Sequence, residues 1–573
     1  MASDLPYHTR NEPLFGPARI SRRKRTILLL LVFVIFGVLW LNSDLDKVQD
    51  TSITQDWKED LENHEDMALE EIRPVESQWK EPQHYNYFVL IASRVGNTQR
   101  RQLIRNNYFG LQDNLEPCMK RDRGVQYLFW LYGDMPQEKT AERRAYETEH
   151  MEWNDFVKVE TDTFHQDKLL RWARDYFEQN KITFDYLIIQ DGYSLIQLNS
   201  IQQTINSQAS TDLIWFSPQS SNILVAGSNA FEKLWEYESD IIDFIPDSSL
   251  TLNLFEFSRA IDIQRKVIES QAESDRLREY FKFPVFLNDP RHVSWDNNIE
   301  TISDQAVSVA NVYQESDFTL LAQTLHIAPL PVCQSLQKAH VAVVTSSFIY
   351  PDSCMEQAAP LAADNKRDYA KAHDYAFIAR STEFAQQALR SDKRRTVWGK
   401  IDAVQKVLPK YDWIFWLDMD AVIMNPEHTV QGTLDQLRAE YPGGPRAFEE
   451  NIDLVIAKPT RDKMINAGVF FMRNTEWSMQ FLREVQAYKK WYNLAPSFEQ
   501  GAMWELLQLP KHAPRVLLLE NDDHTFNTLP KRYFPGDFIV HFAPDKCPGP
   551  AVLNGLEAAK RIQQGEIIER FEE

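Results

Sequence analysis

The feature that most constrains the fold is a short run of apolar residues that ends in two aspartates. Trp413 to Leu417 are aromatic or branched, and the length of this run is typical of a strand buried inside a sheet. Asp418 and Asp420 follow directly, and Pro426 stops any longer extension of the chain. Because side chains alternate along a strand, we expect both carboxylates to point to the same side where the strand ends.

The end of a buried strand is also the place where ligands bind in an open α/β sheet. Two carboxylates at that place suit a hard divalent cation that keeps other positions free for the oxygens of a diphosphate. A bare Asp-x-Asp pattern is common, and an acidic turn after a core strand is the alternative interpretation. The strand before the two aspartates and the residues described below favour the metal site.

The size and charge of the chain limit the class of protein that it can represent. Its 573 residues are enough for more than one domain, and apolar residues make up 43% of them, which can fill large cores. The 62 basic and 83 acidic residues leave a formal net charge of −21, which argues against nucleic acid as a partner. Four cysteines are too few for a disulfide scaffold. They allow one or two bridges in an oxidising compartment, and the sequence does not pair them.

The N-terminal segment predicts a single membrane anchor. A basic cluster at residues 22–25 precedes an uncharged apolar run at 26–41, which is short for a bilayer that needs roughly 20 residues. A cleaved signal peptide is the alternative, but the long leading segment and the lack of a small-x-small site after Leu41 favour an uncleaved anchor. Basic clusters stay cytosolic, so we expect a cytosolic tail (1–25), a transmembrane signal anchor (26–42), an acidic stem (43–84) and a lumenal C-terminus.

Strand and helix patterns alternate in the next segment, residues 85–260. Strands are predicted near residues 87–92, 125–131, 156–159 and 184–190, and helices near 97–108 and 166–179. This alternation is typical of an α/β domain with a largely parallel sheet. Residues 261–337, which contain several prolines, are expected to form a partly ordered connector.

Residues 85–240 resemble, distantly, the family 31 β-1,3-glycosyltransferases. The matching pieces are Phe88-Val89-Leu90-Ile91-Ala92-Ser93, Arg100-Arg101-x-x-Ile104-Arg105, Trp153-Asn154-Asp155-Phe156-Val157 and the strand into Gln190-Asp191-Gly192. That family carries three consecutive acidic residues at the last position, whereas only Asp191 remains here. A site with one carboxylate should bind a cation weakly, so the resemblance predicts a degenerate, non-catalytic domain. An unrelated α/β domain is the alternative.

A second α/β domain is predicted for residues 338–573. A buried strand at 340–346 ends in small polar residues that include Thr345, at the place where nucleotide-sugar enzymes bind the nucleotide. Ile401, Val404 and Leu408 form the apolar face of a helix that Pro409 ends. A turn of small residues at 466–468 feeds another strand, and its Gly468 allows a close approach of the backbone to a ligand.

Residues 338–545 resemble the family 34 glycosyltransferases, which include fungal α-galactosyl- and α-mannosyltransferases and plant xyloglucan α-xylosyltransferases. The matching motifs are Asn365-Lys366-x-x-Tyr369-x-x-x-His373, Trp398-x-Lys400, Trp416-Leu417-Asp418-x-Asp420-Ala421, Asn466-Ala467-Gly468, Arg473-Asn474-x-x-Trp477, Glu499-Gln500 and His541-Phe542. The resemblance implies a GT-A fold, a Mn²⁺-dependent nucleotide-sugar donor (a UDP- or GDP-sugar) and retention of the anomeric configuration. An enzyme that retains configuration needs no strong base on the opposite face of the sugar, and no obvious acid/base pair is present.

The resemblance also implies roles for individual residues. Asp418, Asp420 and His541 would bind the metal, although a lone histidine after a strand is usually structural. Thr345, Asn365 and Tyr369 would lie near the nucleotide, with packing as the alternative for Tyr369. Glu499 and Gln500 would lie near the donor sugar. Lys546 would stabilise the departing diphosphate, with a solvated surface lysine as the alternative. Gly501, Pro544 and Asp545 depart from the usual family residues, which leaves the recognition of the sugar open.

The sequence therefore predicts two GT-A-like, Rossmann-like domains in tandem behind one N-terminal transmembrane helix. The protein is expected to be a type II membrane protein of the Golgi that transfers a hexose, galactose or mannose before xylose, to a glycan acceptor on a glycoprotein or polysaccharide. The alternative is a non-catalytic subunit that binds or scaffolds partner enzymes, and assembly with other glycosyltransferases fits either prediction. A second active domain is disfavoured by Gln190 and Gly192.

Overall fold

The structure is a computed structural model. It describes residues 82–216, 223–232, 285–286, 290–333, 339–351, 353–390, 394–495, 497–543 and 547–571. The predicted tail and anchor, and nearly all of the predicted stem, lie outside these ranges, as do Pro544, Asp545 and Lys546. Within the described ranges, no helix has the length and apolar character needed to cross a membrane.

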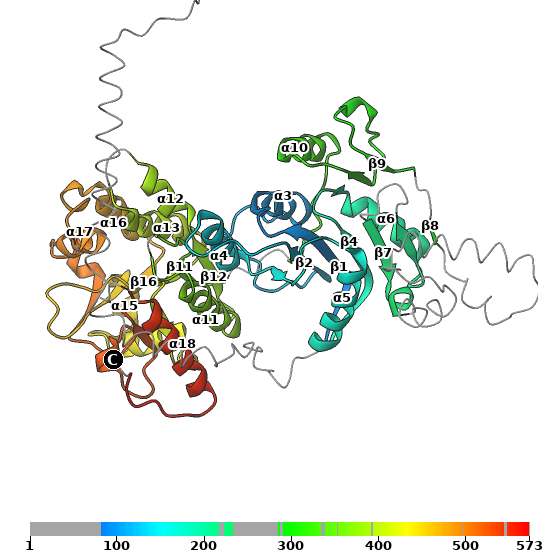
Figure 1. The fold of residues 1–573 in the computed structure, drawn as a ribbon. Helices are drawn as coiled ribbons and strands as arrows, with labels where there is room; N and C mark the ends of the chain where they lie inside the picture. Colours follow the sequence, from blue (N-terminus) through cyan, green and yellow to red (C-terminus); the bar gives the residue numbers. More distant parts are fainter. Residues whose placement is uncertain are drawn as a thin grey trace, which may run out of the picture. The chain divides into compact units, whose positions relative to one another are not determined.

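A seven-stranded sheet in the order β3-β2-β1-β4-β7-β6-β8 forms the centre of the N-terminal domain (Figure 1). The first four strands in this order are parallel, and β7 runs antiparallel between β4 and β6. The strands are β1 (Gln83–Arg94), β2 (Val125–Tyr132), β3 (Phe156–Lys158), β4 (Ile182–Gln190), β6 (Ile214–Phe216), β7 (Ile223–Gly227) and β8 (Val285–Phe286).

Helices cover both faces of this sheet because its central strands are buried on both sides. Residues 88–92 of β1 are fully buried, and their side chains divide between two hydrophobic clusters. Helices α3 (Thr98–Phe109) and α6 (Leu198–Gln208) pack into one cluster and α5 (Gln166–Asn180) into the other. A further helix, α4 (Ala141–Trp153), was not predicted from the sequence.

The described part of the expected connector is more ordered than the sequence indicates. Strands β9 (His292–Ser294) and β10 (Ser308–Ala310) form a small sheet with β5 (Leu195–Ile196), and η1 (Ile299–Thr301) and α10 (Glu315–Thr324) lie in the same segment. Val309 and Phe318 share the hydrophobic cluster that contains Tyr108 of α3. The segment therefore adds to the N-terminal core. Its strands are too short to give a clear alternating pattern.

The C-terminal domain is built on a six-stranded sheet in the order β12-β11-β13-β16-β15-β17. The strands are β11 (Val341–Ser346), β12 (Ala376–Arg380), β13 (Trp413–Leu417), β15 (Leu454–Lys458), β16 (Val469–Arg473) and β17 (Val516–Glu520). A separate pair, β14 (Ala421–Ile423) and β18 (Ile539–His541), is antiparallel. The strand predicted at Trp413–Leu417 is confirmed and is fully buried.

Helices also enclose the C-terminal sheet. Helices α11 (Ala358–Ala372), α14 (Val430–Glu440), α15 (Gly444–Asn451) and α18 (Gly549–Gln563) pack on one side, in the cluster that contains Phe415. On the other side, around Trp416, lie α12 (Thr382–Leu389), α13 (Gly399–Val407), α16 (Glu476–Ala487) and α17 (Phe498–Leu507). Short 3-10 turns, η2 (Thr396–Trp398), η3 (Leu408–Lys410), η4 (Lys489–Trp491), η5 (Ala513–Arg515) and η6 (Pro530–Arg532), complete the domain. The predicted core face of Ile401, Val404 and Leu408 is confirmed.

The two sheets share one strand order. The order β2-β1-β4-β7-β6-β8 corresponds strand for strand to β12-β11-β13-β16-β15-β17, with the same parallel and antiparallel neighbours. The N-terminal sheet has one extra edge strand, β3. The predicted α/β class is thus confirmed for both halves, and β4 of the first corresponds to β13 of the second.

Two disulfides pair all four cysteines. Cys118 and Cys333 have their Cα atoms 6.0 Å apart, and Cys354 and Cys547 have theirs 5.6 Å apart. The first bridge ties the loop after α3 to the end of the segment after α10. The second ties the loop after β11 to the chain just beyond β18.

Candidate active site

The two aspartates lie in a turn directly after β13. The strand ends at Leu417, so the alternation of side chains along a strand does not bring Asp418 and Asp420 together, which corrects the sequence argument. Hydrogen bonds hold the turn instead. The Asp418 amide donates to the carbonyl of Gly468 at 2.7 Å, and the Trp416 indole Nε1 donates to Asp418 Oδ1 at 2.7 Å. The aspartates therefore converge because of the turn.

His541 joins them through the pairing of β14 and β18. Ala421 lies opposite His541 in that pair, so the histidine lies beside the turn that precedes Ala421. Its Nε2 is 3.3 Å from Asp420 Oδ1, and one ligand atom from each of Asp418, Asp420 and His541 lies within 4.8 Å of the others. Over the described ranges, this is the group of acidic, histidine or cysteine residues that could hold a metal ion.

The imidazole of His541 is held in one orientation. Its Nδ1 lies 3.1 Å from Asn527 Oδ1, and a Cβ added to Gly468 would lie 2.0 Å from its Cε1. Gly468 was predicted to allow a close approach of the backbone to a ligand. In the structure the group packed against Gly468 is the His541 ring, and a side chain at position 468 would displace that ring.

The chemistry of this group fits a divalent cation. With Nδ1–H donating to Asn527 Oδ1, Nε2 presents its lone pair toward the Asp420 carboxylate, and two acceptors at this distance need a cation or a proton between them. Burial raises the pKa of Asp420, but attraction to His541 and hydrogen bonds leave that pKa below its usual range. Two carboxylates and one imidazole form a donor set suited to Mn²⁺.

Lys400, at the start of α13, is a site residue to which the sequence analysis gave no role. Its Nζ lies 2.9 Å from Asp418 Oδ1, 3.4 Å from Glu499 Oε1 and 3.1 Å from the carbonyl oxygen of Ala467. Burial lowers the pKa of Lys400, yet the two carboxylates together raise it above its ordinary value. The resemblance over Trp398-x-Lys400 was the available signal, but it does not say which residues the lysine contacts.

Glu499 and Gln500, the expected catalytic pair, lie in the first turn of α17 beside this lysine. Glu499 is buried, and burial raises the pKa of its carboxyl even though Lys400 stabilises the charge. Gln500 Oε1 accepts a hydrogen bond from the amide of Ala467 at 2.8 Å. The structure therefore brings both residues to the aspartates. Their contact with a sugar stays a prediction, as does the role of Lys546.

Two of the residues expected near the nucleotide form hydrogen bonds with the backbone that follows the aspartates. The Asn365 amide group bonds both the N–H and the C=O of Ile423, at 2.9 and 3.0 Å, and the Tyr369 hydroxyl donates to the carbonyl of His428. Thr345 is buried at the end of β11. Contact of these three residues with a nucleotide stays a prediction.

The sequence analysis gave no role to two more residues near the site, Lys366 and Tyr350. Lys366 Nζ donates to the carbonyl of Ala421 at 2.6 Å, and burial lowers its pKa to about 7 although Asp420 and Asp418 favour its charged form. Tyr350 lies in the loop after β11 and is 41% exposed. Partial desolvation of its hydroxyl raises its pKa, and the charges of Glu499 and Asp418 raise it further.

At the corresponding place in the N-terminal domain, the described residues form no such group. Asp191 follows the end of β4, is buried, and has a pKa raised to about 6 by that burial. Tyr193, three residues after the end of β4, stands where Asp420 stands three residues after the end of β13, so the second carboxylate is missing. The β5–β10 pair corresponds to the β14–β18 pair of the other domain. Val309 takes the place of Val540, so the next residue, Ala310, takes the place of His541.

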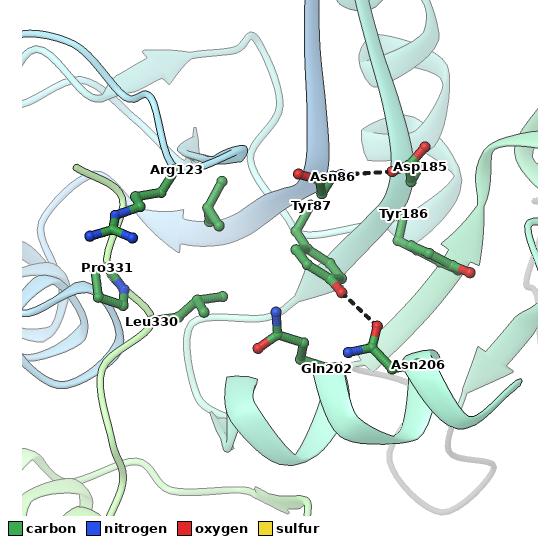
Figure 2. Close-up of a pocket in the computed structure, with 10 residues that line it drawn as sticks. Asn86, Tyr87, Arg123, Asp185, Tyr186, Gln202, Asn206, Leu330 and Pro331 are labelled. Atoms are coloured by element: carbon green, nitrogen blue, oxygen red, sulfur yellow. Dashed lines mark hydrogen bonds between the residues drawn. The ribbon is translucent and has the colours of Figure 1, made fainter. Parts of the chain in front are cut away.

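A separate hollow of about 500 Å³ lies at the amino ends of β1 and β4, the opposite edge of the sheet from Asp191. Figure 2 shows two hydrogen bonds among its lining residues: Asn86 donates to Asp185 (3.0 Å), and the Tyr87 hydroxyl donates to Asn206 (3.1 Å). Because of its location, the hollow is separate from the strand ends that carry Asp191 and Asp418.

A mixed α/β sheet with an Asp-x-Asp turn and a histidine at its ligand-binding edge is the arrangement that the resemblance to family 34 predicts. A comparison with known families matches the same part of the chain. Residues 337–547 match the galactosyl transferase GMA12/MNN10 family, and the resemblance to family 34 over residues 338–545 is confirmed. The resemblance of residues 85–240 to family 31 stays a prediction.

Curated relatives match the same part of the chain. A putative glycosyltransferase of Arabidopsis thaliana is 28% identical over 192 residues, 30% of this chain and 37% of the relative. An uncharacterised α-1,2-galactosyltransferase of Schizosaccharomyces pombe is 29% identical over 31% of this chain and 54% of its own length. A probable α-1,6-mannosyltransferase of Saccharomyces cerevisiae is 25% identical over 25% and 39%. The chain thus covers about half, or less, of the length of these relatives.

Solved structures of glycosyltransferases are similar only at low scores. A glycosyltransferase involved in glycosylation of the major capsid of PBCV-1 covers 39% of this chain and 98% of its own, with 18% identity and a TM-score of 0.28. The bifunctional glycosyltransferase WbbM covers 83% and 99%, with 10% identity and a TM-score of 0.28. Likeness at scores this low does not identify a function.

Proposed function

We propose that the C-terminal domain transfers a hexose from a nucleotide sugar to a glycan acceptor and retains the configuration of the anomeric carbon. The observation that carries this proposal is the convergence of Asp418, Asp420 and His541, with Lys400 and Glu499 beside them. Galactose and mannose are the preferred sugars because relatives of this segment are named as galactosyl- and mannosyltransferases, and xylose ranks below them.

Asp418, Asp420 and His541 would hold Mn²⁺ in this proposal. When bound, the metal supplies positive charge where the diphosphate of a UDP- or GDP-sugar becomes more negative as its bond to the sugar breaks. Asn527 keeps the histidine in the orientation and tautomer that binding requires. Asp418 forms an ion pair with Lys400, and this contact fixes the position of the Asp418 carboxylate.

The other residues of the chain would orient the sugar and the leaving group. Glu499 and Gln500, in the first turn of α17, contact Lys400 and the amide of Ala467, and would contact the donor sugar. Lys546 would approach the diphosphate from the segment that the Cys354–Cys547 disulfide ties down. No strong base on the far face of the sugar is needed for retention.

The N-terminal domain would be a degenerate GT-A-like domain in tandem with the catalytic one. The shared strand order supports the tandem, and Tyr193 in the place of Asp420 together with Ala310 in the place of His541 supports the loss of a metal site. A non-catalytic subunit that scaffolds partner enzymes is the second candidate. The complete C-terminal group argues against it, since a scaffold has no use for a preserved metal site.

A donor screen tests the proposal. The full chain, solubilised in detergent, is incubated with UDP- and GDP-sugars that carry galactose, mannose, glucose or xylose, with Mn²⁺ or with EDTA, and nucleotide release is measured. We expect release from one galactose or mannose donor with Mn²⁺ and at least tenfold less with EDTA. Absence of release and of transfer with every donor, in a protein that is folded and binds Mn²⁺, would favour the scaffold.

We also propose that the chain is a single-pass type II protein of the Golgi membrane with lumenal domains. The pairing of all four cysteines supports an oxidising compartment. The basic cluster at residues 22–25 supports a cytosolic N-terminus. In intact microsomes, the C-terminal domain should resist added protease until detergent is present. Digestion without detergent contradicts this topology.

A further inference from the structure

Helix α4 of the N-terminal domain carries a carboxylate to the ligand-binding edge of the C-terminal sheet. Glu152 Oε1 accepts hydrogen bonds from Ser347 Oγ at 2.8 Å, Ser381 Oγ at 2.6 Å and the amide of Ser381 at 3.1 Å. Ser347 is the first residue after β11, and Ser381 is the first after β12. Figure 1 shows α4 beside these two strands.

The helix that carries Glu152 is held rigidly from both domains. On its own side, Glu149 forms buried ion pairs with Arg101 at 2.6 Å and Arg105 at 2.8 Å. On the other side, Arg367 of α11 donates to the carbonyl of Met151 at 2.6 Å. Glu152 is thus positioned by the fold before any ligand binds, as binding groups generally are.

The strand order indicates where the nucleoside of a donor lies. From β11 the chain continues to β12 on one side, and later to β13 on the other, so the crevice at this switch point opens between the ends of β11 and β13. Asp418, at the end of β13, marks the diphosphate end of the crevice. Ser347, directly after β11, lies at the other strand of this crevice, so the nucleoside end lies toward Ser347 and its neighbour Ser381.

We propose that Glu152 forms part of the nucleoside subsite of the donor site, with its second oxygen accepting a hydrogen bond from a ribose hydroxyl. All three hydrogen bonds of the carboxylate go to Oε1, and Oε2 has no hydrogen-bond partner among the described residues. An acidic side chain on a ribose hydroxyl is a recurrent device of nucleotide-binding α/β folds. This inference rests on the proposed function, and it makes the N-terminal domain a part of the donor site.

The test measures the affinity of the full chain, in detergent with Mn²⁺, for UDP and GDP and for their 2′-deoxy and 3′-deoxy forms. The wild-type protein should bind the ribonucleotide of its donor about tenfold more tightly than at least one deoxy form, because a hydrogen bond to a charged acceptor is lost. Glu152→Gln places an amide N–H₂ where Oε2 stands, since Oε1 must still face the Ser381 amide. It should weaken ribonucleotide binding about tenfold and leave binding of that deoxy form nearly unchanged.

Glu142→Gln, an exposed change in the first turn of the same helix, is the matched control and should bind every ligand as the wild type does. An equal loss for ribo and deoxy ligands in Glu152→Gln would mean that Glu152 only holds the two domains together, which overturns the inference. So would a wild-type protein that binds nucleotide without distinguishing the ribose from either deoxyribose, although the proposed function would then stand. A wild-type protein that binds neither UDP nor GDP overturns both.

Discussion

Replacing Asp420 with asparagine should reduce sugar transfer by about a hundredfold to a thousandfold, the usual cost of losing one group that stabilises charge in a transition state. Asp420 is one of three candidate ligands that converge within 4.8 Å, and its Oδ1 lies 3.3 Å from His541 Nε2. An amide oxygen is a neutral and weaker ligand than a carboxylate. The side chain is partly exposed in a turn, so the fold should survive. Transfer and Mn²⁺ affinity are measured together with thermal unfolding.

Asp191→Asn is the matched control, because it makes the same change at the corresponding strand end of the N-terminal domain. We expect transfer close to that of the wild type. Asp191 is buried, and burial already raises its pKa to about 6, so an uncharged side chain is well tolerated at that position. A loss of transfer in Asp191→Asn equal to that in Asp420→Asn would contradict a degenerate N-terminal site. Near-normal turnover of Asp420→Asn at saturating Mn²⁺ would contradict the metal assignment.

The sequence predicts the parts of the site that are continuous in the chain. A strand that is buried on both faces has apolar residues at every position, so the apolar run Trp413–Leu417 could be predicted as a buried strand. The structure has β13 with these same bounds. The motif that includes His541 is likewise visible as the end of a strand. What brings these pieces together is the pairing of β14 with β18, over a hundred residues apart, and no local pattern encodes that register.

Contacts between distant polar residues could not be predicted. Lys400 opens a helix whose apolar face is evident, but its partners Asp418 and Glu499 come from two other elements. Arg101 and Arg105 of α3 are buried against Glu149 and Asp155, and no local pattern in the sequence shows these contacts. Helix α4 has a weak apolar pattern because one face meets arginines and the other meets the second domain, and Glu152 was missed for that reason.

Replacing Lys400 with methionine should destabilise the C-terminal domain by about 3–5 kcal/mol, the cost of removing one partner from a buried ion pair. Lys400 and Glu499 are each only 5% exposed, so the variant leaves the Glu499 carboxylate in the core without a counter-charge. Asp418 loses the same partner and with it a fixed position. Transfer should therefore fall at least a hundredfold even at temperatures where the variant is folded. Chemical denaturation followed by tryptophan fluorescence measures the first effect, and the donor assay measures the second.

Two further variants show whether the ion pair is the cause. Lys406→Met, on the same helix, removes a lysine that is 43% exposed and lies 3.2 Å from Glu383, and it should cost less than about 1 kcal/mol. Adding Glu499→Gln to Lys400→Met removes the uncompensated charge, so the double variant should regain part of the lost stability while transfer stays low. If Lys400→Met proves as stable as Lys406→Met, then Lys400 does not compensate the buried charge of Glu499. If the double variant regains transfer as well, then Lys400 serves only to offset Glu499 and has no role in positioning Asp418.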